Sequence, residues 1–494
     1  MRSAIASLLL LSAAAHAGDP GTLHRAVDAF DAGNHRGAAI GFHQVAEGSA
    51  PADQRETAEY DLAQSLDRMG LDFSAFYYYG QIVQAGPRHR FYLQAVQGAV
   101  AVIERTGDEV VGPSVLDKGY SEEVGKLPPG IRSKLDYALA LLGYRAGRYA
   151  DAGKFLQGVT PQSPGYAQAQ YLAGLLAQRT DPENALRTFR GILALDGGGY
   201  GDLKELKELT HLALGRTLFG LRRYAEASAE YAALPRFSRH WDEALFEGAY
   251  ADLQNDDPGA ALGKLHSLHS PHLSDEFAPE SQNLTAVIYH QHCLWPQVRA
   301  VLDRFQREYV PMRDQVKAFL ERDPPAEELV ASLETAGKIP APVQRHLRKN
   351  ERIESMLAYL QRLDAEARAI RGDGELMGSP LGPDLQDLIG RQRALALQLT
   401  GKFVRGRMAD VAHLIDVLDG EKEIIGFETT KGEKQFLEEN VDVKGRLAAQ
   451  KLQRPAMPAS GHEYWPFDGE YWPDEIGYYR YTIKDACPSG RKED

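Results

Sequence analysis

The chain has 494 residues, of which 43% are hydrophobic and 25% are charged, a composition typical of a foldable protein rather than a disordered one. The excess of Asp and Glu over Lys and Arg gives a net charge of -13, which argues against a nucleic-acid-binding protein because such proteins usually carry a basic surface. Two cysteines are too few for a disulfide-rich scaffold or a four-cysteine zinc site. Composition therefore excludes these classes and selects no activity.

The first 17 residues have the layout of a bacterial secretory signal peptide. Arg2 supplies a positive end, residues 4–11 form an apolar run, and Ala15-His16-Ala17 is a small-x-small cleavage signal. The alternative is an ordinary buried helix. No later stretch reaches the ~20 apolar residues that a membrane span needs. We therefore expect residues 1–17 to be removed, leaving a periplasmic chain without a direct membrane span.

A helix-turn-helix pattern recurs from about residue 20 to residue 310. In its clearest copy a small residue follows Leu214, an apolar residue comes three positions after that, and Tyr224, Ala227 and Tyr231 follow a turn. Small residues are expected where two helices cross closely, and aromatic residues between neighbouring pairs. The predicted crossing positions are Ala38, Ala75, Ala152, Ala185, Ala227, Ala261 and Val298. The one double-length gap among them predicts a further helix pair between Tyr92 and Leu116.

These segments resemble the tetratricopeptide repeat (TPR), a helix pair of about 34 residues. The resemblance implies an elongated, all-α superhelical solenoid over residues 18–322, with a concave groove lined by the first helix of each pair. It implies partner binding and no catalysis. The family's groove positions fall in this chain at Tyr60, Gln64, Arg68, Tyr137, Tyr144, Arg145, Arg216 and His290. The alternative is a set of unrelated amphipathic helices.

Residues 340–455 predict a long helical, coiled-coil-like hairpin. Apolar residues from Ile353 to Ile370 alternate in spacings of three and four, as in a heptad seam. Residues 371–383 are rich in Gly and Pro and predict a connecting loop. A second apolar series starts at Leu385 and could continue to Leu452, although Gly420, Gly426 and Gly432 weaken a helix there. Self-association through the seam is the competing interpretation.

Residues 456–494 predict an irregular, acidic and aromatic tail. A Glu-Tyr-Trp-Pro sequence occurs twice, seven residues apart, and its prolines exclude a regular helix. An aromatic set of this density must be covered, so we expect it to pack on the helices or on a partner. Alternatively, its rings stack on a glycan while carboxylates hold the sugar hydroxyls. The candidate contact residues are Trp465, Phe467, Glu470, Tyr471 and Trp472.

The two cysteines could pin this tail to the repeats. Cys293 falls in the turn of the last clear repeat, and Cys487 follows the aromatic segment. In an oxidising compartment a Cys293–Cys487 bond would persist. The alternatives are a buried apolar Cys293 and a free or intermolecular Cys487.

Motifs of known chemistry are missing from the sequence. It contains no His-Glu-x-x-His, Gly-x-Ser-x-Gly or Cys-x-x-Cys, so we predict no catalytic residue and no enzyme. His266, His269 and His272 are spaced three apart, with His290 and His292 one repeat later. Because Pro271 ends the helix and no carboxylate accompanies them, we expect solvated histidines, no metal site and no cofactor.

The sequence therefore predicts a non-enzymatic scaffold that mediates protein–protein interactions in a bacterial envelope complex. The repeat around Trp295, the long helices and the tail are also similar to envelope TPR proteins associated with myxobacterial-type gliding motility, which implies a place in such machinery. The expected partners are other envelope proteins and not nucleic acid. The alternative function is peptidoglycan or glycan binding by the tail.

Overall fold

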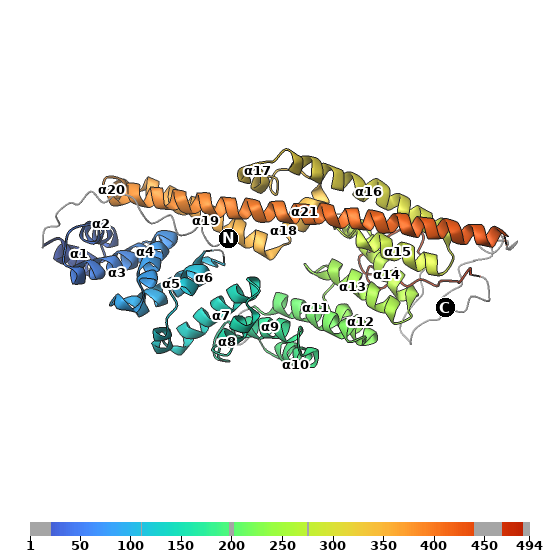
Figure 1. The fold of residues 1–494 in the computed structure, drawn as a ribbon, viewed down its shortest axis with the longest axis horizontal. Helices are drawn as coiled ribbons and strands as arrows, with labels where there is room; N and C mark the ends of the chain where they lie inside the picture. Colours follow the sequence, from blue (N-terminus) through green and yellow to red (C-terminus); the bar gives the residue numbers. More distant parts are fainter. Residues whose placement is uncertain (1–20, 110, 197–201, 274–275, 439–466, 488–494) are drawn as a thin grey trace. The chain divides into compact units, whose positions relative to one another are not determined.

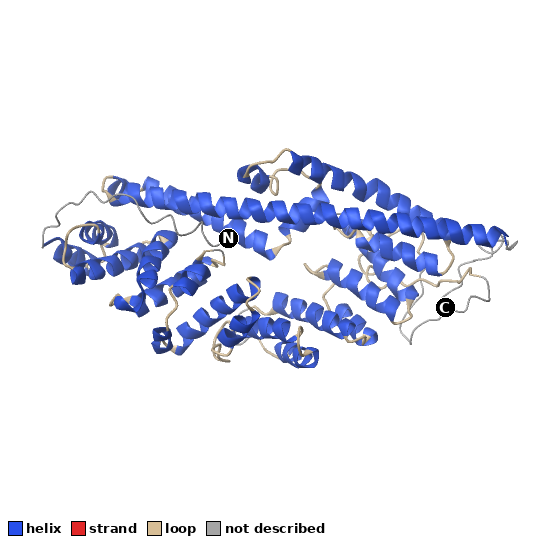
Figure 2. Cartoon of the chain, in the orientation of Figure 1, coloured by secondary structure: helices blue, strands red, loops and turns tan. Residues whose placement is uncertain are grey.

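The computed structural model describes residues 21–109, 111–196, 202–273, 276–438 and 467–487. These residues form 21 α-helices and three 3-10 helices and contain no strand (Figure 2). The chain divides into two compact units, each built from two stretches of sequence. The first unit is Met1–Ala169 with Glu354–Thr400, and the second is Gln170–Ile353 with Gly401–Asp494. The expected signal peptide, residues 1–17, lies outside the described residues.

The first unit is a series of helices in which each packs on the next (Figure 1). They are α1 (Gly21–Asp31), α2 (His35–Ala46), α3 (Ala52–Arg68), α4 (Asp72–Ala85), α5 (Tyr92–Thr106), α6 (Gly112–Lys118), α7 (Pro129–Arg145) and α8 (Tyr149–Leu156). Two 3-10 helices, Gly86–Arg88 and Glu122–Lys126, lie between them, and α9 (Tyr166–Ala177) begins in this unit. The unit also contains most of α19 (Glu351–Gly372), α20 (Gly374–Met377) and residues 381–400 of α21 (Leu381–Glu438). The pair α5 and α6 occupies the stretch where the long gap predicted one.

The second unit continues with helices that pack on their neighbours in the same way. They are α10 (Pro182–Leu193), α11 (Lys204–Gly220), α12 (Tyr224–Ala232), α13 (Trp241–Gln254), α14 (Pro258–Leu268), α15 (Glu280–Gln291) and α16 (Trp295–Glu321). A 3-10 helix, Pro271–Leu273, follows α14, and the short helices α17 (Ala326–Ala331) and α18 (Ala341–Arg348) follow α16. Residues 401–438 of α21 and the irregular segment 467–487 complete the unit.

One turn geometry joins the two helices of seven pairs. In each, a residue with positive φ is followed by a residue whose N–H donates to the carbonyl five positions earlier, over 2.8–3.2 Å, as in a Schellman cap. The positive-φ residues are Gly33, Gly70, Gly107, Gly147, Arg222, Asp256 and Cys293. Glycine suits this position because it has no Cβ to clash in the left-handed conformation. The turn recurs although the residue that fills it changes.

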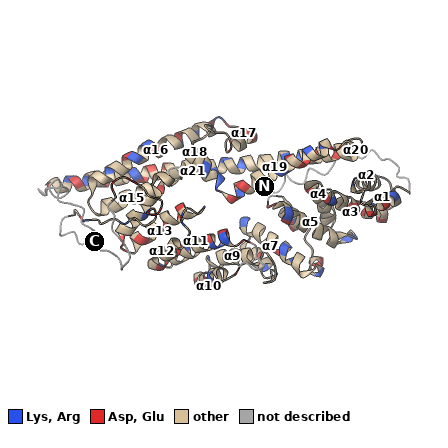
Figure 3. Cartoon of the chain, turned by 180° about the vertical axis from the view of Figure 1, so that it is seen from behind, with Lys and Arg blue, Asp and Glu red and all other residues tan. Residues whose placement is uncertain are grey.

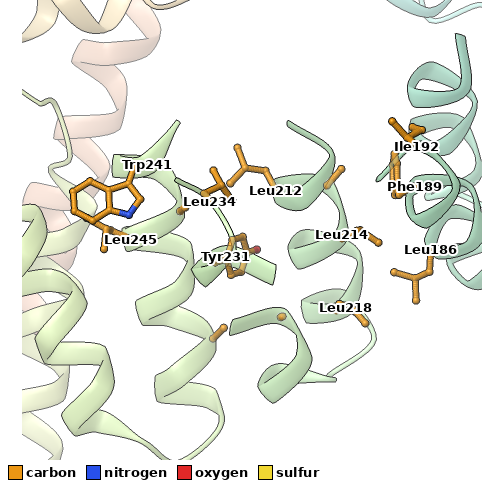
Figure 4. Close-up of a cluster of buried hydrophobic side chains, with 14 of the residues drawn as sticks. Leu186, Phe189, Ile192, Leu212, Leu214, Leu218, Tyr231, Leu234, Trp241 and Leu245 are labelled. Atoms are coloured by element: carbon orange, nitrogen blue, oxygen red, sulfur yellow. The ribbon is translucent and has the colours of Figure 1, made fainter. Parts of the chain in front are cut away.

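The predicted crossing positions are buried where the helices meet. Ala38, Ala75, Ala152, Ala185, Ala227, Ala261 and Val298 all have 0% exposure. On α11 a methyl group in place of Gly215 would lie 2.6 Å from the ring of Tyr231, so only glycine lets α12 pack this closely. Tyr231 belongs to a cluster with Leu214 and Leu218 of α11 and Phe189 of α10 (Figure 4). Small residues at the crossings and large ones beside them therefore form the core.

The C-terminal helices differ from the prediction at the expected loop. Residues 371–383 are not a plain loop, because the Asp373 carboxylate accepts the N–H groups of Glu375 and Leu376 and caps α20, and α21 already begins at Leu381. The glycines of α21 do not end the helix. A methyl group at Gly432 would lie 3.1 Å from the Trp295 ring, so glycine makes room for that indole. Residues 439–455 of the predicted hairpin lie outside the described residues.

Candidate partner-binding surfaces

In the first unit, three of the predicted groove residues lie on α3. The Tyr60 ring stacks on Phe91 with ring centroids 4.7 Å apart, and its hydroxyl accepts a hydrogen bond from the Gln64 amide at 2.8 Å. Arg68 is exposed at the end of the helix. Burial raises the pKa of the neighbouring Asp61 to about 6, although Arg90 opposes the shift. This face of α3 therefore offers an aromatic ring, an amide, a cation and a partly buried carboxyl group.

The next three predicted residues lie together on α7. Tyr137 and Tyr144 are half-buried, and the Tyr144 ring meets Tyr149 edge-on with centroids 5.7 Å apart. The Arg145 guanidinium pairs with Glu109 at 2.6 Å. The α7 residues are thus held in place by contacts within the unit while remaining partly accessible.

In the second unit, Arg216 of α11 forms ion pairs with two carboxylates of α13. Figure 3 shows the distribution of charged residues along the chain. The Arg216 guanidinium lies 2.6 Å from Glu243 and 2.7 Å from Glu247. Such a double ion pair fixes the side chain between consecutive repeats. An incoming partner would have to compete with both carboxylates for this arginine.

The other predicted residue of this unit, His290 on α15, is covered by α21. Its ring lies 3.1 Å from the Thr429 hydroxyl and packs against Trp295 with ring centroids 5.1 Å apart. Two turns earlier on the same helix, the buried Asn283 amide donates to the Leu418 carbonyl at 2.9 Å. In the second unit this face of α15 therefore already holds a helix of the same chain.

The described part of the tail lies along α14 on a line of small residues. The Tyr481 N–H donates to the Gly259 carbonyl at 3.0 Å, and the Gly477 N–H donates to the Ser267 hydroxyl at 2.9 Å. Between these bonds, a methyl group at Gly263 would overlap the carbonyl oxygen of Tyr479. Because Gly259, Gly263 and Ser267 are spaced four apart, they share one helix face and leave room for the extended backbone. The tail runs antiparallel to α14.

His266, on the same helix, is enclosed by aromatic rings of the tail. Its ring stacks on Tyr471 at 5.0 Å and meets Phe467 and Tyr479 edge-on at 4.6 and 4.7 Å. Its Nδ1 lies 3.0 Å from the Tyr481 hydroxyl. Burial lowers the pKa of His266 to about 4. The expectation of a solvated histidine is therefore wrong at this position, because the tail excludes water from the imidazole.

Further contacts fix the tail at both ends. Near its start, Ile476 is fully buried, and the Arg236 guanidinium donates to the carbonyls of Asp474 and Ile476 at 2.8 and 3.1 Å. Near its end, the Ala486 N–H donates to the His292 carbonyl at 3.0 Å. Cys487 is disulfide-bonded to Cys293, with the two Cα atoms 5.1 Å apart.

The outer face of the tail remains aromatic. Trp472 and Tyr478 are 53% and 74% exposed, and Phe467, whose ring also meets His266, is 45% exposed. Glu470 is exposed and Tyr471 half-buried, so the predicted contact residues fall on both faces of the segment. Trp465 lies outside the described residues. The tail thus has an inner face that docks and an outer face that a ligand could reach.

Sequence reasoning missed two polar networks. Glu366 of α19 is buried in the first unit, and its carboxylate accepts the N–H groups of Phe73 and Ser74 at 2.8 Å, capping α4. In the second unit, Asp252 bonds both Lys264 and Ser228. Neither network follows a sequence motif. Glu366 lies 292 residues from Ser74, and the Asp252 network joins single polar residues of three consecutive helices, α12, α13 and α14. Within the described residues, no group of three or more His, Cys, Asp or Glu side chains is placed to hold a metal ion.

A comparison with models of known protein families gives no match for this chain, and neither does a comparison with curated proteins. In the described part of the chain, no helix combines the length and the apolar character that crossing a membrane requires.

Proposed function

We propose that this chain is a non-enzymatic, tetratricopeptide-type scaffold that binds other proteins in a bacterial envelope. The observation that carries the proposal is the seven-fold recurrence of one helix-pair turn, at Gly33, Gly70, Gly107, Gly147, Arg222, Asp256 and Cys293. Stacked helix pairs of this kind create extended surfaces to which each pair adds side chains. The zero exposure of all seven crossing positions supports the repeat register.

The partner-binding face proposed here is the first-helix face of the first unit. It includes Tyr60, Gln64 and Arg68 on α3 and Tyr137 and Tyr144 on α7. We favour it over the corresponding residues of the second unit, because Arg216 is held by two carboxylates and His290 is covered by α21. Aromatic rings beside an arginine are a common composition for the centre of a protein interface.

Photo-crosslinking in the native host tests this face. A photoreactive amino acid at position 68, on first helix α3, should form adducts with an envelope protein. The matched control is position 154, on second helix α8, where Lys154 is 79% exposed and should give none. Adducts at both positions, or at neither, would contradict the groove assignment. N-terminal sequencing of the mature protein tests the envelope location separately, since cleavage after Ala17 would leave Gly18 as the first residue.

A second candidate function is glycan binding by the tail. It is favoured by the exposed Trp472 and Tyr478 rings, which flank a turn that contains Asp474 and Glu475. Sedimentation with purified cell-wall sacculi distinguishes the two. A chain that co-sediments, and no longer does so as Trp472→Ala, would favour the glycan function over the scaffold.

A further inference from the structure

The outer face of α21 carries apolar side chains that no described residue of the second unit covers. Among the described residues, the exposed large aliphatic side chains are Val417, Ile424 and Leu437, and all three belong to this helix. Ile424 and Leu437 are 66% exposed, as is Phe427. Solvent-facing helix positions are normally polar, so a concentration of this kind marks an interaction surface.

Three of these side chains form a continuous stripe with Gly420. Val417, Gly420, Ile424 and Phe427 follow one another at spacings of three, four and three, which places them on one helix face. No atom lies within 4 Å of where a Cβ on Gly420 would be, so the stripe has a gap that a partner side chain can enter. Leu437 lies off this face, about 120° around the helix from the stripe's centre at 100° per residue.

The opposite face of the same helix is already used. Ile415, Leu418 and Phe436 are buried on that face, and Glu433 on the same side pairs with Arg299 of α16. The helix is therefore held on its inner side while its outer stripe stays open. A helix that is already held in place can bind a partner helix as a coiled coil at a lower entropic cost, because it does not have to be ordered on binding.

The flanks of the stripe determine which partner fits. Glu421 and Glu428 lie on one side of it and Glu423 on the other. Lys422 points inward, where it is 7% exposed and bonded to Asp419 and Glu423. Lys431, one turn beyond Phe427 on the same face, is exposed and pairs with Glu428 at 3.2 Å, so carboxylates outnumber exposed cations along the stripe. A second copy of this chain would bring like charges together along both flanks, which disfavours self-association through this stripe.

We propose that this stripe, which we call the outer seam and define as Val417, Gly420, Ile424 and Phe427, binds an amphipathic helix of another protein. That helix carries apolar residues at alternating spacings of three and four, with Lys or Arg on its flanks. The seam belongs to the second unit, whereas the α3 and α7 face assigned above belongs to the first. The inference therefore stands or falls independently of the proposed scaffold function.

The test uses the full mature chain and two designed helical peptides as probes. Both peptides have Leu in the heptad seam; one has Lys at the flanking positions and the other has Glu. Fluorescence anisotropy of the labelled peptides should show that the Lys peptide binds and weakens as salt rises, whereas the Glu peptide does not bind. Failure of the Lys peptide to bind, or equal binding of both, would overturn the proposal.

Variants locate the site. Ile424→Lys should weaken binding of the Lys peptide at least about tenfold, because it places a cation in the seam. The matched control is Leu437→Lys, equally exposed on the same helix but off the seam, which should bind as the parent chain does. Equal losses in the two variants would refute the seam. A dimer in light scattering that Ile424→Lys dissociates would identify a second copy as the occupant and would also refute it.

Discussion

Replacement of Gly263 by Ala should loosen the tail without damaging the helix beneath it. The new methyl group would overlap the Tyr479 carbonyl oxygen, so the tail backbone must move outward. Such a movement strains the two hydrogen bonds on either side, from Tyr481 to Gly259 and from Gly477 to Ser267. Alanine itself favours the helical conformation by about 1 kcal/mol over glycine, so α14 should remain intact.

The size of the effect follows from those two hydrogen bonds. Each contributes about 1 kcal/mol, so losing both costs docking about 2 kcal/mol. Because 1.4 kcal/mol is a factor of ten, docking should become about 30-fold less favourable.

The equilibrium for forming the Cys293–Cys487 disulfide measures this change in the free energy of tail docking. In a glutathione redox buffer, the fraction closed measures the effective concentration of one thiol near the other, and docking of the tail raises that concentration. Alkylation followed by mass spectrometry should therefore show an effective concentration lower in Gly263→Ala by up to about 30-fold, the full factor applying where the reduced tail is mostly undocked. The control is Gly191→Ala on α10, where no atom lies near the new methyl group and no change is expected. A folded Gly263→Ala chain with unchanged closure would refute the docking geometry.

Three further predictions concern the repeats and the tail. Ala227→Leu places a larger side chain at a fully buried helix crossing and should lower the free energy of unfolding by ~1–3 kcal/mol. Ala225→Leu, on the exposed face of α12, should lower it little. Equal melting temperatures of the two variants would show that the repeat register is wrong. Arg222→Gly relieves a positive φ of 59° and should raise stability by up to about 1 kcal/mol in chemical denaturation, whereas a loss would contradict the turn assignment. Because burial lowers the pKa of His266 from 6.5 to about 4, its stabilising effect is complete above pH 6.5 and is lost as the pH falls toward 4. The melting temperature should fall over that window in the parent chain and fall less in His266→Gln, and an equally steep fall in both would exclude this histidine as the cause.

The repeat core could be predicted from sequence because its signals are local. A small residue at each crossing and a leucine or aromatic residue nearby recur within one helix pair, so spacing alone locates them. The spacing predicts Ala152 and Ala261 at crossings, and both have no exposed surface. The helix pair α5 and α6, for which no motif was recognised, could be located from the length of the gap.

The partners of the C-terminal elements could not be predicted, because they depend on contacts between distant segments. A heptad seam identifies the buried side of α19 but not the helix that Glu366 caps, 292 residues from Ser74. The docking line on α14 did have a signal, since Gly259, Gly263 and Ser267 are spaced four apart. That spacing indicates a helix face without large side chains, but it does not predict that the aromatic tail packs on that face.

Cys293 connects the repeats to the tail and allows one more prediction. It occupies the positive-φ turn position that glycine fills in four other pairs, and its φ of 58° matches theirs in sign. Cys293→Gly should therefore keep the turn while removing the disulfide, whereas Cys487→Ser removes the disulfide and leaves a strained residue in the turn.

Both variants should lose stability, because the bond closes a separation of 194 residues. The chain-entropy model gives ~4–5 kcal/mol as an upper value for such a loop. Cys293→Gly should, however, remain more stable than Cys487→Ser by up to about 1 kcal/mol, the usual cost of a left-handed conformation in a residue other than glycine. Chemical denaturation of the two variants and the oxidised parent chain measures both differences. If Cys293→Gly were the less stable of the two variants, the turn would not have the geometry that it shares with the other pairs.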